Sequence, residues 1–503
     1  MDRDDAEPGR PHPPPLREVP VRALDVDRLG AIVGRRRIDD FARTAARMRA
    51  LLDGRAIFNV NSTAAGGGVA EMLQSLLAYV RGAGVDARWL VIDGDPAFFA
   101  ITKRIHNGLY GGPGDGGPLG GAERDRYERV LRRNARRLTA IVRPGDVVIL
   151  HDPQPAGLAA AARRAGALVV WRSHVGAERP NEWTERAWSF LRPQLAAADA
   201  FVVSRPAFAP PWAAPGQVHA IPPSIDPFSA KNAELDADRV RRTLLSAGLL
   251  ADGDRDGDGG RPGDRAAPPF VHRDGSPGRV GRRDGLLVSG PPPPARSPLV
   301  AQVSRWDAMK DMAGVMEGFA AHVDAALGAH LLLVGPAVGG VADDPEAAGV
   351  LDDCVRRRQA LPAAARERVH LACMPMDDPD EQAAIVNAVQ RHAAVVVQKS
   401  RAEGFGLTVA EAMWKRRPVV ASAVGGIRDQ IEDGRSGLLL DDPADLPAFG
   451  AAVERLLRDR GEAARLAANA RARVVDRFLG DRHLERWAAL VAALVERETS
   501  HAI

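Results

Sequence analysis

The sequence predicts an α/β protein made of two doubly wound domains that face a central cleft. Short apolar stretches alternate with amphipathic helical patterns, which is typical of parallel sheets with helices on both faces. This alternation runs through two blocks of similar size. Between them lies a stretch dominated by Gly, Pro, Asp and Arg, from about residue 251 to residue 297. Such a composition buries too little apolar surface to offset the entropy of ordering, so we expect a disordered connection.

The first block begins with a strand, a glycine-bearing loop and a helix. Residues 56–60 (AIFNV) have the composition of a buried strand, and the loop 62–68 follows directly. The next apolar positions recur at helical spacing: Val69, Met72, Leu73, Leu76, Leu77 and Val80. Further strands are expected at 89–92, 147–150, 168–171 and 201–203.

The second block repeats this pattern. Residues 299–303 predict a strand, and the helix after it carries Val315, Met316, Phe319 and Val323 on one face. Further strands are expected at 331–334, 395–397 and 419–421, and the chain after Phe478 is helical by its pattern. Ligands of such domains bind beyond the carboxyl ends of the strands, so two of them predict a cleft between both sets of strand ends.

Composition excludes several classes of protein. The 503 residues carry a formal net charge of +3, too small an excess to indicate a nucleic-acid partner. The only cysteines, Cys354 and Cys373, form neither a metal-ligand spacing nor a disulfide framework. No stretch approaches the ~18 apolar residues of a membrane span, and the start lacks an apolar signal segment. We therefore expect a cytoplasmic protein with no nucleic-acid partner and no membrane partner.

The strongest chemical signal is the segment 403–411 (EGFGLTVAE). Glu403 precedes a loop with two glycines, and Glu411 lies eight residues later, inside a predicted helix. Gly404 and Gly406 allow a ligand to approach the backbone, and free amides at a helix start suit a diphosphate. Glu403 could then accept hydrogen bonds from sugar hydroxyls, and Glu411 from a ribose diol. The alternative is an ordinary helix with two solvated carboxylates.

Two cations follow the first strand of the second block. Arg305 and Lys310 lie in the segment 303–310 (VSRWDAMK), at the end of the strand where ligands bind. Together they can neutralise a departing diphosphate without a metal ion. The alternative is a pair of surface cations.

The ends of strands in the first block carry further candidates. The glycine loop 63–69 lacks the G-x-G-x-x-G spacing of a dinucleotide fingerprint, and it is either an anion cradle or a simple turn. Asp152 follows one strand in the segment HDPQP, and His174 follows the next in WRSH. His174 could hydrogen-bond a sugar hydroxyl, although a lone histidine is more often structural.

One acidic run is rejected as a metal site. Residues 252–258 (DGDRDGD) resemble part of a calcium loop, but its twelfth position is Gly263 where a bidentate Glu is needed.

Taken together, the E-x7-E element, the SRWDAMK segment and the glycine loop resemble the family-four retaining glycosyltransferases, which have the two-domain GT-B fold. Within that family, HDPQPAGL, WRSHVG, IPPSIDPFSAKN and VVQKSRAEGFGLTVAEAMWK are similar to segments of trehalose synthases of the glycosyl-transferring type. The resemblance covers nearly everything from about Asp53 to Trp487, apart from the connecting stretch.

The resemblance implies transfer of glucose from a nucleoside-diphosphate glucose to C1 of glucose, giving α,α-trehalose reversibly, with no metal or other cofactor. It leaves open the donor base, the favoured direction and the presence of a homo-oligomer. It implies catalytic roles for His174, Arg305, Lys310 and Glu403. The donor-binding residues it implies are Gly67, Gly68, Gly404, Phe405, Gly406, Leu407 and Glu411. The weaker acceptor-side candidates are Asp152, Asn181 and Trp183.

The same resemblance sets the expected domain organisation. We expect a disordered tail (1–20), a Rossmann-like acceptor-side domain (21–245), a disordered insertion (246–297), a Rossmann-like nucleotide-sugar domain (298–480) and a helix that crosses back to the first domain (481–503). Two departures from the family stand out. Ala402 takes the place where the family often has Arg, and the insertion expands what is usually a short connection.

Two rival functions remain open from the sequence. A retaining trehalose phosphorylase shares the fold and many of the motifs, because groups that hold a diphosphate also hold a phosphate. A non-catalytic sugar-nucleotide sensor would keep the fold but lose the cations or the glutamates, and all four of these residues are present.

Overall fold

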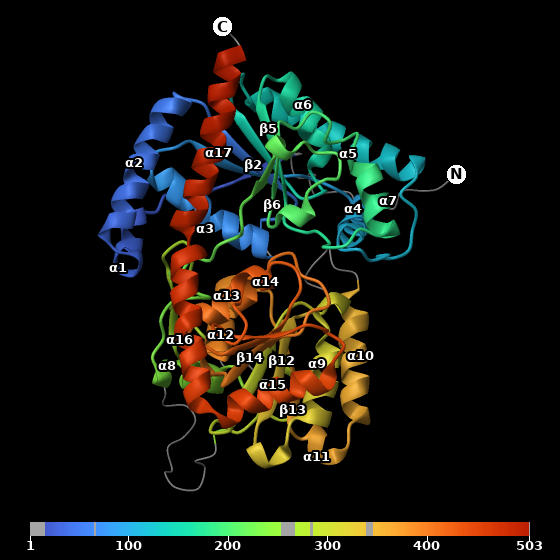
Figure 1. The fold of residues 1–503 in the computed structure, drawn as a ribbon, viewed down its shortest axis with the longest axis vertical. Helices are drawn as coiled ribbons and strands as arrows, with labels where there is room; N and C mark the ends of the chain where they lie inside the picture. Colours follow the sequence, from blue (N-terminus) through green and yellow to red (C-terminus); the bar gives the residue numbers. More distant parts are fainter. Residues whose placement is uncertain (1–15, 65–66, 253–266, 282–284, 339–345, 502–503) are drawn as a thin grey trace, which may run out of the picture.

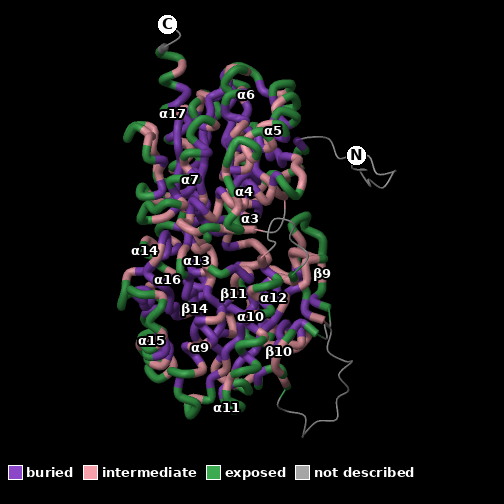
Figure 2. The backbone as a smooth tube through the Cα atoms, turned by 90° about the vertical axis from the view of Figure 1, so that its right-hand side faces the viewer, coloured by how far each residue is buried: buried purple, intermediate pink, exposed green. Residues whose placement is uncertain are grey.

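The computed structural model describes residues 16–64, 67–252, 267–281, 285–338 and 346–501. Two α/β domains are stacked end to end along the long axis, with the loops at their facing ends in contact (Figure 1). The central strands are buried in both domains, while exposed residues lie on the outer helices (Figure 2). This is the pair of facing parallel-sheet domains that the alternating pattern predicted.

In the described part of the chain, the N-terminal sheet has the strand order β1-β3-β2-β4-β5-β6-β7. Only β1 is antiparallel to its neighbour. The strands are β1 Arg17–Val19, β2 Ile57–Asn61, β3 Ala87–Val91, β4 Val147–His151, β5 Leu168–Ser173, β6 Ala200–Val203 and β7 Val218–Ala220. The helices are α1 Gly30–Val33, α2 Arg35–Leu52, α3 Gly68–Gly82, α4 Pro96–Leu109, α5 Gly121–Ile141, α6 Ala159–Arg164, α7 Glu182–Leu191 and α8 Ala237–Ser246.

The C-terminal sheet repeats this arrangement in the order β10-β13-β12-β11-β14-β15-β16, again with one antiparallel edge strand among the described residues. Its strands are β10 Leu287–Ser289, β11 Leu299–Val303, β12 His330–Pro336, β13 Val369–Met374, β14 Val395–Gln398, β15 Val419–Ser422 and β16 Leu438–Leu440. The helices are α9 Met312–His322, α10 Ala347–Ala360, α11 Ala363–Arg366, α12 Pro379–His392, α13 Leu407–Trp414, α14 Ile427–Gln430, α15 Leu446–Arg458 and α16 Arg460–Arg477.

The order of the strands places a ligand crevice in each sheet. In one sheet the strands that precede and follow β2 in the order lie on opposite sides of it, because β3 is added on one side and β4 on the other. In the other sheet β12 and β14 lie on opposite sides of β11 in the same way. Each reversal is a topological switch point, where the loops at the carboxyl ends of two adjacent strands separate. The two crevices therefore lie after β2 and β4 in one domain, and after β11 and β14 in the other.

The last two helices connect the domains. Helix α16 packs on the C-terminal core, and α17 (Gly480–His501) runs up along the N-terminal domain beside α2 (Figure 1). Leu490, Val491, Leu494 and Val495 of α17 are buried against the N-terminal sheet. The C-terminal end of the chain therefore forms part of the N-terminal core.

The predicted disorder of the connection 246–297 is wrong for its described parts. Residues 269–271 and 277–279 form a hairpin (β8 Pro269–Val271, β9 Pro277–Arg279), and β10 pairs with β13. Phe270, Val280 and Leu286 are buried in the C-terminal core. The average composition concealed these few apolar residues, and each of them packs against a preformed surface. Residues 253–266 lie outside the described residues, as does the acidic run after Asp252.

The predicted N-terminal tail also ends earlier than expected. Leu16 is buried, and β1 pairs with the edge strand β3, so residues 16–20 are ordered. An alternating pattern of three residues is too short to be recognised as a strand from sequence alone. Residues 1–15 lie outside the described residues.

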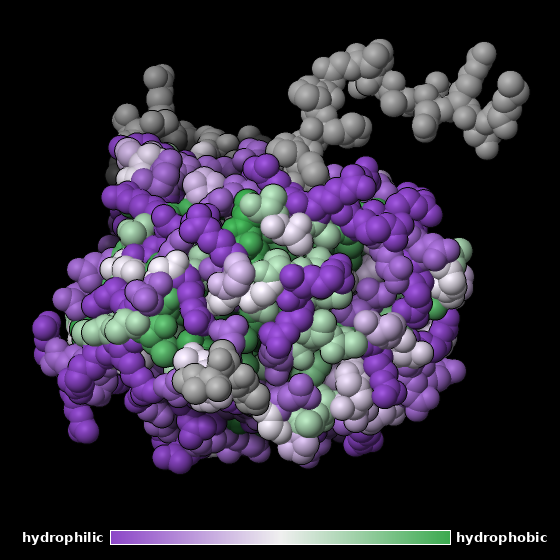
Figure 3. Space-filling model, turned by 90° about the horizontal axis from the view of Figure 1, so that it is seen from above, coloured by the Kyte–Doolittle hydropathy of each residue, from purple (hydrophilic) through white to green (hydrophobic). Residues whose placement is uncertain are grey.

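The surface is mainly polar. Seen from the end formed by the N-terminal domain, hydrophilic side chains surround small apolar patches (Figure 3). Among the described helices, none has the length and apolar character needed to cross a membrane.

Candidate active site between the two domains

The two switch points bring the predicted site residues to the facing ends of the domains. The loops after the strands supply them as follows: Gly67 and Gly68 after β2, Asp152 after β4, His174 after β5, Arg305 and Lys310 after β11, and Glu403 after β14. Residues that are far apart in the sequence therefore meet because each follows a strand of one of two parallel sheets.

Two glycines allow the domains to touch. A Cβ atom on Gly404 would lie 2.1 Å from the carbonyl oxygen of His174, and one on Gly68 would lie 2.8 Å from the Leu407 side chain. The first contact is with backbone, which cannot move aside as the end of a side chain can. Only glycine therefore fits at residue 404, and this fit places Glu403 directly beside the His174 loop.

A buried ion pair forms the centre of the C-terminal side. The Lys310 ammonium donates to a Glu403 carboxylate oxygen at 2.6 Å, and the two side chains are 14% and 7% exposed. Ser400 donates to the same carboxylate oxygen at 3.3 Å. A substrate that offers a phosphate to Lys310 and hydroxyls to Glu403 would replace this pair without leaving either charge unpartnered.

The loop that carries the cations is held in place by a second set of charges. Arg305 pairs with Asp307 at 3.3 Å, and Asp307 also accepts from the Met309 amide at 2.8 Å. Asp311, directly after Lys310, takes a positive φ of 50° and bonds the buried Lys399 ammonium. These bonds fix the position of the Lys310 backbone relative to β14.

Helix α13 begins at the glycines of the E-x7-E element. Gly406 has a φ of 83°, which turns the chain into the helix and leaves the first amides open. The Phe405 ring points away from the cleft and packs against Phe478 in the core. Only the backbone of Phe405 is therefore placed to contact a donor.

Glu411 lies on α13 and meets the N-terminal domain through Lys231, which the sequence analysis missed. The Lys231 ammonium lies 3.3 Å from one Glu411 carboxylate oxygen and 3.1 Å from Glu71 of α3. The second Glu411 carboxylate oxygen is buried and has no hydrogen-bond partner within the described residues. A buried acceptor without a donor is costly, so this oxygen is suited to a ligand hydroxyl. Lys231 lies in the segment SAKN, but its spacing gave no signal of this contact.

A chain of side chains extends from His174 into the N-terminal domain. His174 Nε2 lies 3.1 Å from His151 Nδ1, and His151 Nε2 lies 3.0 Å from the Asn59 side-chain oxygen. Burial lowers the pKa of His151 to about 3 and holds the pKa of His174 well below its usual range, so both rings are neutral. His151 must then donate to Asn59 and accept from His174, which leaves His174 Nδ1 as a hydrogen-bond acceptor.

Asp152 holds the same loop through a hydrogen bond to its backbone. Its carboxylate accepts from the His174 amide at 2.7 Å, and its carbonyl accepts from the Trp171 indole at 2.9 Å. The backbone of Asp152 has a positive φ of 65°. Burial raises the pKa of Asp152 to about 7, against the lowering effect of that hydrogen bond and of Arg172.

Helix α4 adds two residues that sequence reasoning missed. The Tyr110 hydroxyl lies next to Gly404, and burial together with the nearby Glu403 raises the pKa of this phenol. Burial, together with the nearby charges of Lys103 and Arg305, lowers the pKa of His106 to about 3. His106 lies within α4, and Tyr110 directly follows it. At such positions nothing in the sequence distinguishes a site residue from an aromatic residue of the core.

Asn181 and Trp183 lie at the start of α7. The Asn181 side chain accepts from the amides of Trp183 and Thr184 and donates to the Gly111 carbonyl at 2.8 Å, so it caps α7. The Trp183 ring lies under the Arg186 guanidinium. In the described part of the chain, no hydrogen bond or ring contact joins either residue to the residues around His174.

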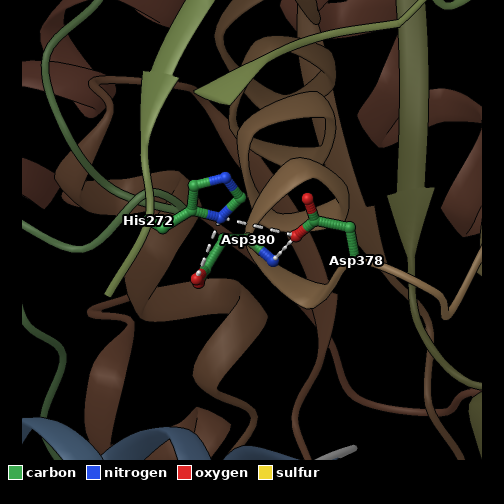
Figure 4. A group of neighbouring side chains, drawn as sticks. All are labelled: His272, Asp378 and Asp380. Atoms are coloured by element: carbon green, nitrogen blue, oxygen red, sulfur yellow. Dashed lines mark hydrogen bonds and ion pairs between the residues drawn. The ribbon is translucent and has the colours of Figure 1, made fainter. Parts of the chain in front are cut away.

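One group of side chains has the composition of a metal site. His272, Asp378 and Asp380 lie where the β8–β9 hairpin meets the start of α12 (Figure 4). Their charges already have partners, however. Asp378 caps α12, and Arg273 donates to Asp380 through both its backbone amide and its guanidinium, at 3.0 and 2.7 Å. The group therefore serves to attach the hairpin to α12.

Comparison with known proteins identifies both halves of the chain. Residues 59–210 match the family model "Trehalose synthase, N-terminal domain", and residues 292–473 match "Glycosyl transferases group 1". A trehalose synthase from Pyrococcus horikoshii is 31% identical over 92% of this chain and 95% of that protein. A trehalose phosphorylase from Pleurotus sajor-caju is 27% identical over 75% of this chain, which spans half of that protein.

The fold is similar to that of solved structures. An α,α-trehalose-phosphate synthase (UDP-forming) from Burkholderia vietnamiensis superposes with a TM-score of 0.61, at 15% identity, over 89% of this chain and 99% of that chain. The predicted GT-B arrangement is confirmed by this likeness.

The pKa of Asp152 leads to a prediction about stability and pH. This pKa is about 7 in the folded protein, whereas an ordinary Asp carboxyl has a pKa of 3.8. Between these two pH values, the folded protein therefore binds more protons at Asp152 than the unfolded protein does. Stability then falls as pH rises through that window. We expect Asp152→Asn, which keeps the shape and tolerates positive φ, to remove this loss. Measured by denaturant unfolding, the wild type should lose about 1–3 kcal/mol relative to Asp152→Asn between pH 5 and pH 8. An equal difference at both pH values would contradict the burial of this charge.

Proposed function

This chain belongs to the trehalose synthase family of glycosyltransferases, and we propose that it transfers glucose from a nucleoside-diphosphate glucose to C1 of glucose. The product would be α,α-trehalose, with the anomeric configuration of the donor retained. The observation that supports this proposal most strongly is the Lys310–Glu403 pair beside His174, because it offers a cation and a carboxylate at one point of the cleft. A glycosyl diphosphate presents the complementary groups there, a phosphate followed by sugar hydroxyls.

The donor would lie along the E-x7-E element. Its glucose would bond Glu403, and its diphosphate would lie against Lys310, Arg305 and the amides of residues 404–407 at the start of α13. Gly67 and Gly68 of the facing domain would approach the diphosphate from the other side. The ribose would bond the unpartnered oxygen of Glu411.

Catalysis would then rest on charge stabilisation and positioning. As the bond from the anomeric carbon to the phosphate oxygen lengthens, negative charge grows on that oxygen beside two cations. The acceptor hydroxyl would attack from the same face, and the departing phosphate oxygen would take its proton. Arg305 and Lys310 supply the positive charge for this step from the protein, so we propose that the reaction needs no added metal ion.

His174 would orient a sugar hydroxyl near the anomeric carbon. Its neutral ring donates to His151 and therefore presents Nδ1 as an acceptor. Asn59 and His151 are positioning residues in this view, because they determine which nitrogen of His174 faces the substrate. Asp152 holds the same loop through the His174 amide. Asn181 and Trp183 remain weaker candidates for the acceptor side, and Asn181 also caps α7.

Phosphorolysis of trehalose is the second candidate function. It is favoured by the similarity to the Pleurotus sajor-caju trehalose phosphorylase, and by cations that would hold phosphate as readily as a diphosphate. Dependence on a nucleotide separates the two reactions.

The direct experiment is to incubate the purified protein with glucose and each of ADP-, UDP- and GDP-glucose, without added metal, and to identify the product by NMR. We expect a 1,1-linked disaccharide with both anomeric centres α, together with released nucleoside diphosphate. No product with any donor would refute the synthase proposal. Glucose 1-phosphate formed from trehalose and phosphate would then support the phosphorylase.

The role of the cations predicts a specific loss of rate. Replacing Arg305 by Ala removes one of the two charges beside the departing diphosphate, so kcat should fall about 100-fold. The control is Arg435→Ala in the same domain. The Arg435 side chain is 75% exposed and pairs with Glu432, which is not a residue of the proposed site. Equal rates for Arg305→Ala and the control would contradict the proposed role.

The chain from Asn59 to His174 predicts a loss that a conservative substitution restores. Asn59→Ala removes the acceptor for His151, so His174 is free to adopt the other tautomer, and kcat should fall about tenfold. Asn59→Asp keeps an acceptor oxygen and should recover most of this loss. The measurement is kcat and KM for each variant, beside its melting temperature. A loss shared equally by both variants would indicate a packing role only.

A further inference from the structure

A pocket of about 350 Å³ extends from Glu411 away from the Lys310–Glu403 pair. It is lined on the core side by α3, α12 and α13, and on the outer side by the β8–β9 hairpin, through Val271, His272, Arg273 and Gly275. Its volume is at the lower end of the range for pockets that hold small molecules. Glu411 and Leu407 line it too, so the pocket begins where the E-x7-E element ends.

The inner end of the pocket offers an unsatisfied acceptor. Lys231 lies beside one oxygen of Glu411, and the other oxygen is buried without a partner. A hydroxyl group satisfies such an oxygen at little cost, and a ribose presents two. A nucleoside that enters from the cleft would therefore place its sugar at Glu411 and its base farther along the pocket.

The outer end of the pocket suits a base. Arg22 and Arg28 line it, and the Arg28 guanidinium lies 4.3 Å from the centre of the Phe228 ring, near Asp226. Guanidinium groups donate to the acceptor edges of bases and stack on their faces. Val271 is 60% exposed and provides an apolar surface for the face of a base.

The hairpin that forms this wall is fixed in place. Phe270 anchors it in the C-terminal core, and Arg273 bonds Asp380 at the start of α12 (Figure 4). Gly281 donates to Glu381 at 2.7 Å. On the other side, Arg22 donates to the Asp274 carbonyl at 3.2 Å, which ties the hairpin to the segment before α1. The hairpin thus bridges both domains over the pocket.

We propose that the β8–β9 hairpin is the outer wall of the site for the donor's nucleoside, and that it contributes directly to nucleotide affinity. The inference rests on the proposed function, since it assigns the nucleoside of the same donor. The hairpin lies outside both regions that match the family models, 59–210 and 292–473. Nucleotide affinity would therefore depend on a segment added to the shared core.

The test compares two exposed valines of the insertion. Val271→Glu places a carboxylate in the pocket wall, while Val288→Glu places one on β10, outside the pocket, where the valine is 43% exposed. Binding of UDP, ADP and GDP is measured by calorimetry for the wild type and for both variants. We expect Val271→Glu to raise the Kd of the preferred nucleotide at least about fivefold, because the new charge repels the diphosphate-bearing ligand. Val288→Glu should leave the Kd unchanged.

A second variant tests the wall without adding a charge. Arg273→Ala removes the guanidinium from the pocket wall together with its bond to Asp380, and keeps the bond of the backbone amide. It should also weaken nucleotide binding, while KM for glucose stays as in the wild type. Wild-type affinity in both Val271→Glu and Arg273→Ala, or equal weakening by Val288→Glu, would overturn the proposal. A wild-type protein that binds none of the three nucleotides would overturn the proposed function, and this inference with it.

Discussion

The structure depends on the close approach of Gly404 to the carbonyl of His174. A side chain at residue 404 would overlap that carbonyl oxygen, so the two domains can meet here only through a glycine. This contact fixes the distance between the loop after β5 and the loop after β14. The Lys310–Glu403 pair, the neutral His174 ring and the start of α13 acquire their mutual positions from it.

The second constraint is electrostatic. Several charges of the site have partners: Lys310 with Glu403, Arg305 with Asp307, and Lys231 with Glu71 and Glu411. The Lys231 contact to Glu411 joins the two domains, and the other two pairs lie within the C-terminal domain. Pairing of this kind keeps the site folded before a substrate arrives, and it lets binding proceed without stranding a buried charge.

Much of this arrangement could be predicted, because the residues lie in the connections that follow apolar strands. Asp152 and His174 directly follow β4 and β5, and Gly67, Lys310 and Glu403 come a few residues after β2, β11 and β14, where the topology of parallel sheets gathers ligand contacts. Other residues carried no such signal: His106 of α4, Tyr110 directly after α4, and Lys231 in a turn, which contacts Glu411.

Two further differences have physical causes as well. The Asn181 side chain caps the helix that begins at residue 182, a role that its place in the sequence had not revealed. The hairpin of the insertion escaped prediction because its stability comes from a few apolar side chains on a preformed core. Average composition does not reveal such contacts.

The most direct test of this account is a crystal structure with a nucleoside diphosphate bound in the absence of divalent metal. The Lys310 ammonium lies 2.6 Å from Glu403. We expect this bond to open when the diphosphate binds, with Lys310 and Arg305 contacting the phosphate oxygens and Glu411 bonding the ribose. A diphosphate bound away from both cations, or a Lys310–Glu403 pair left intact beside it, would contradict the central claim.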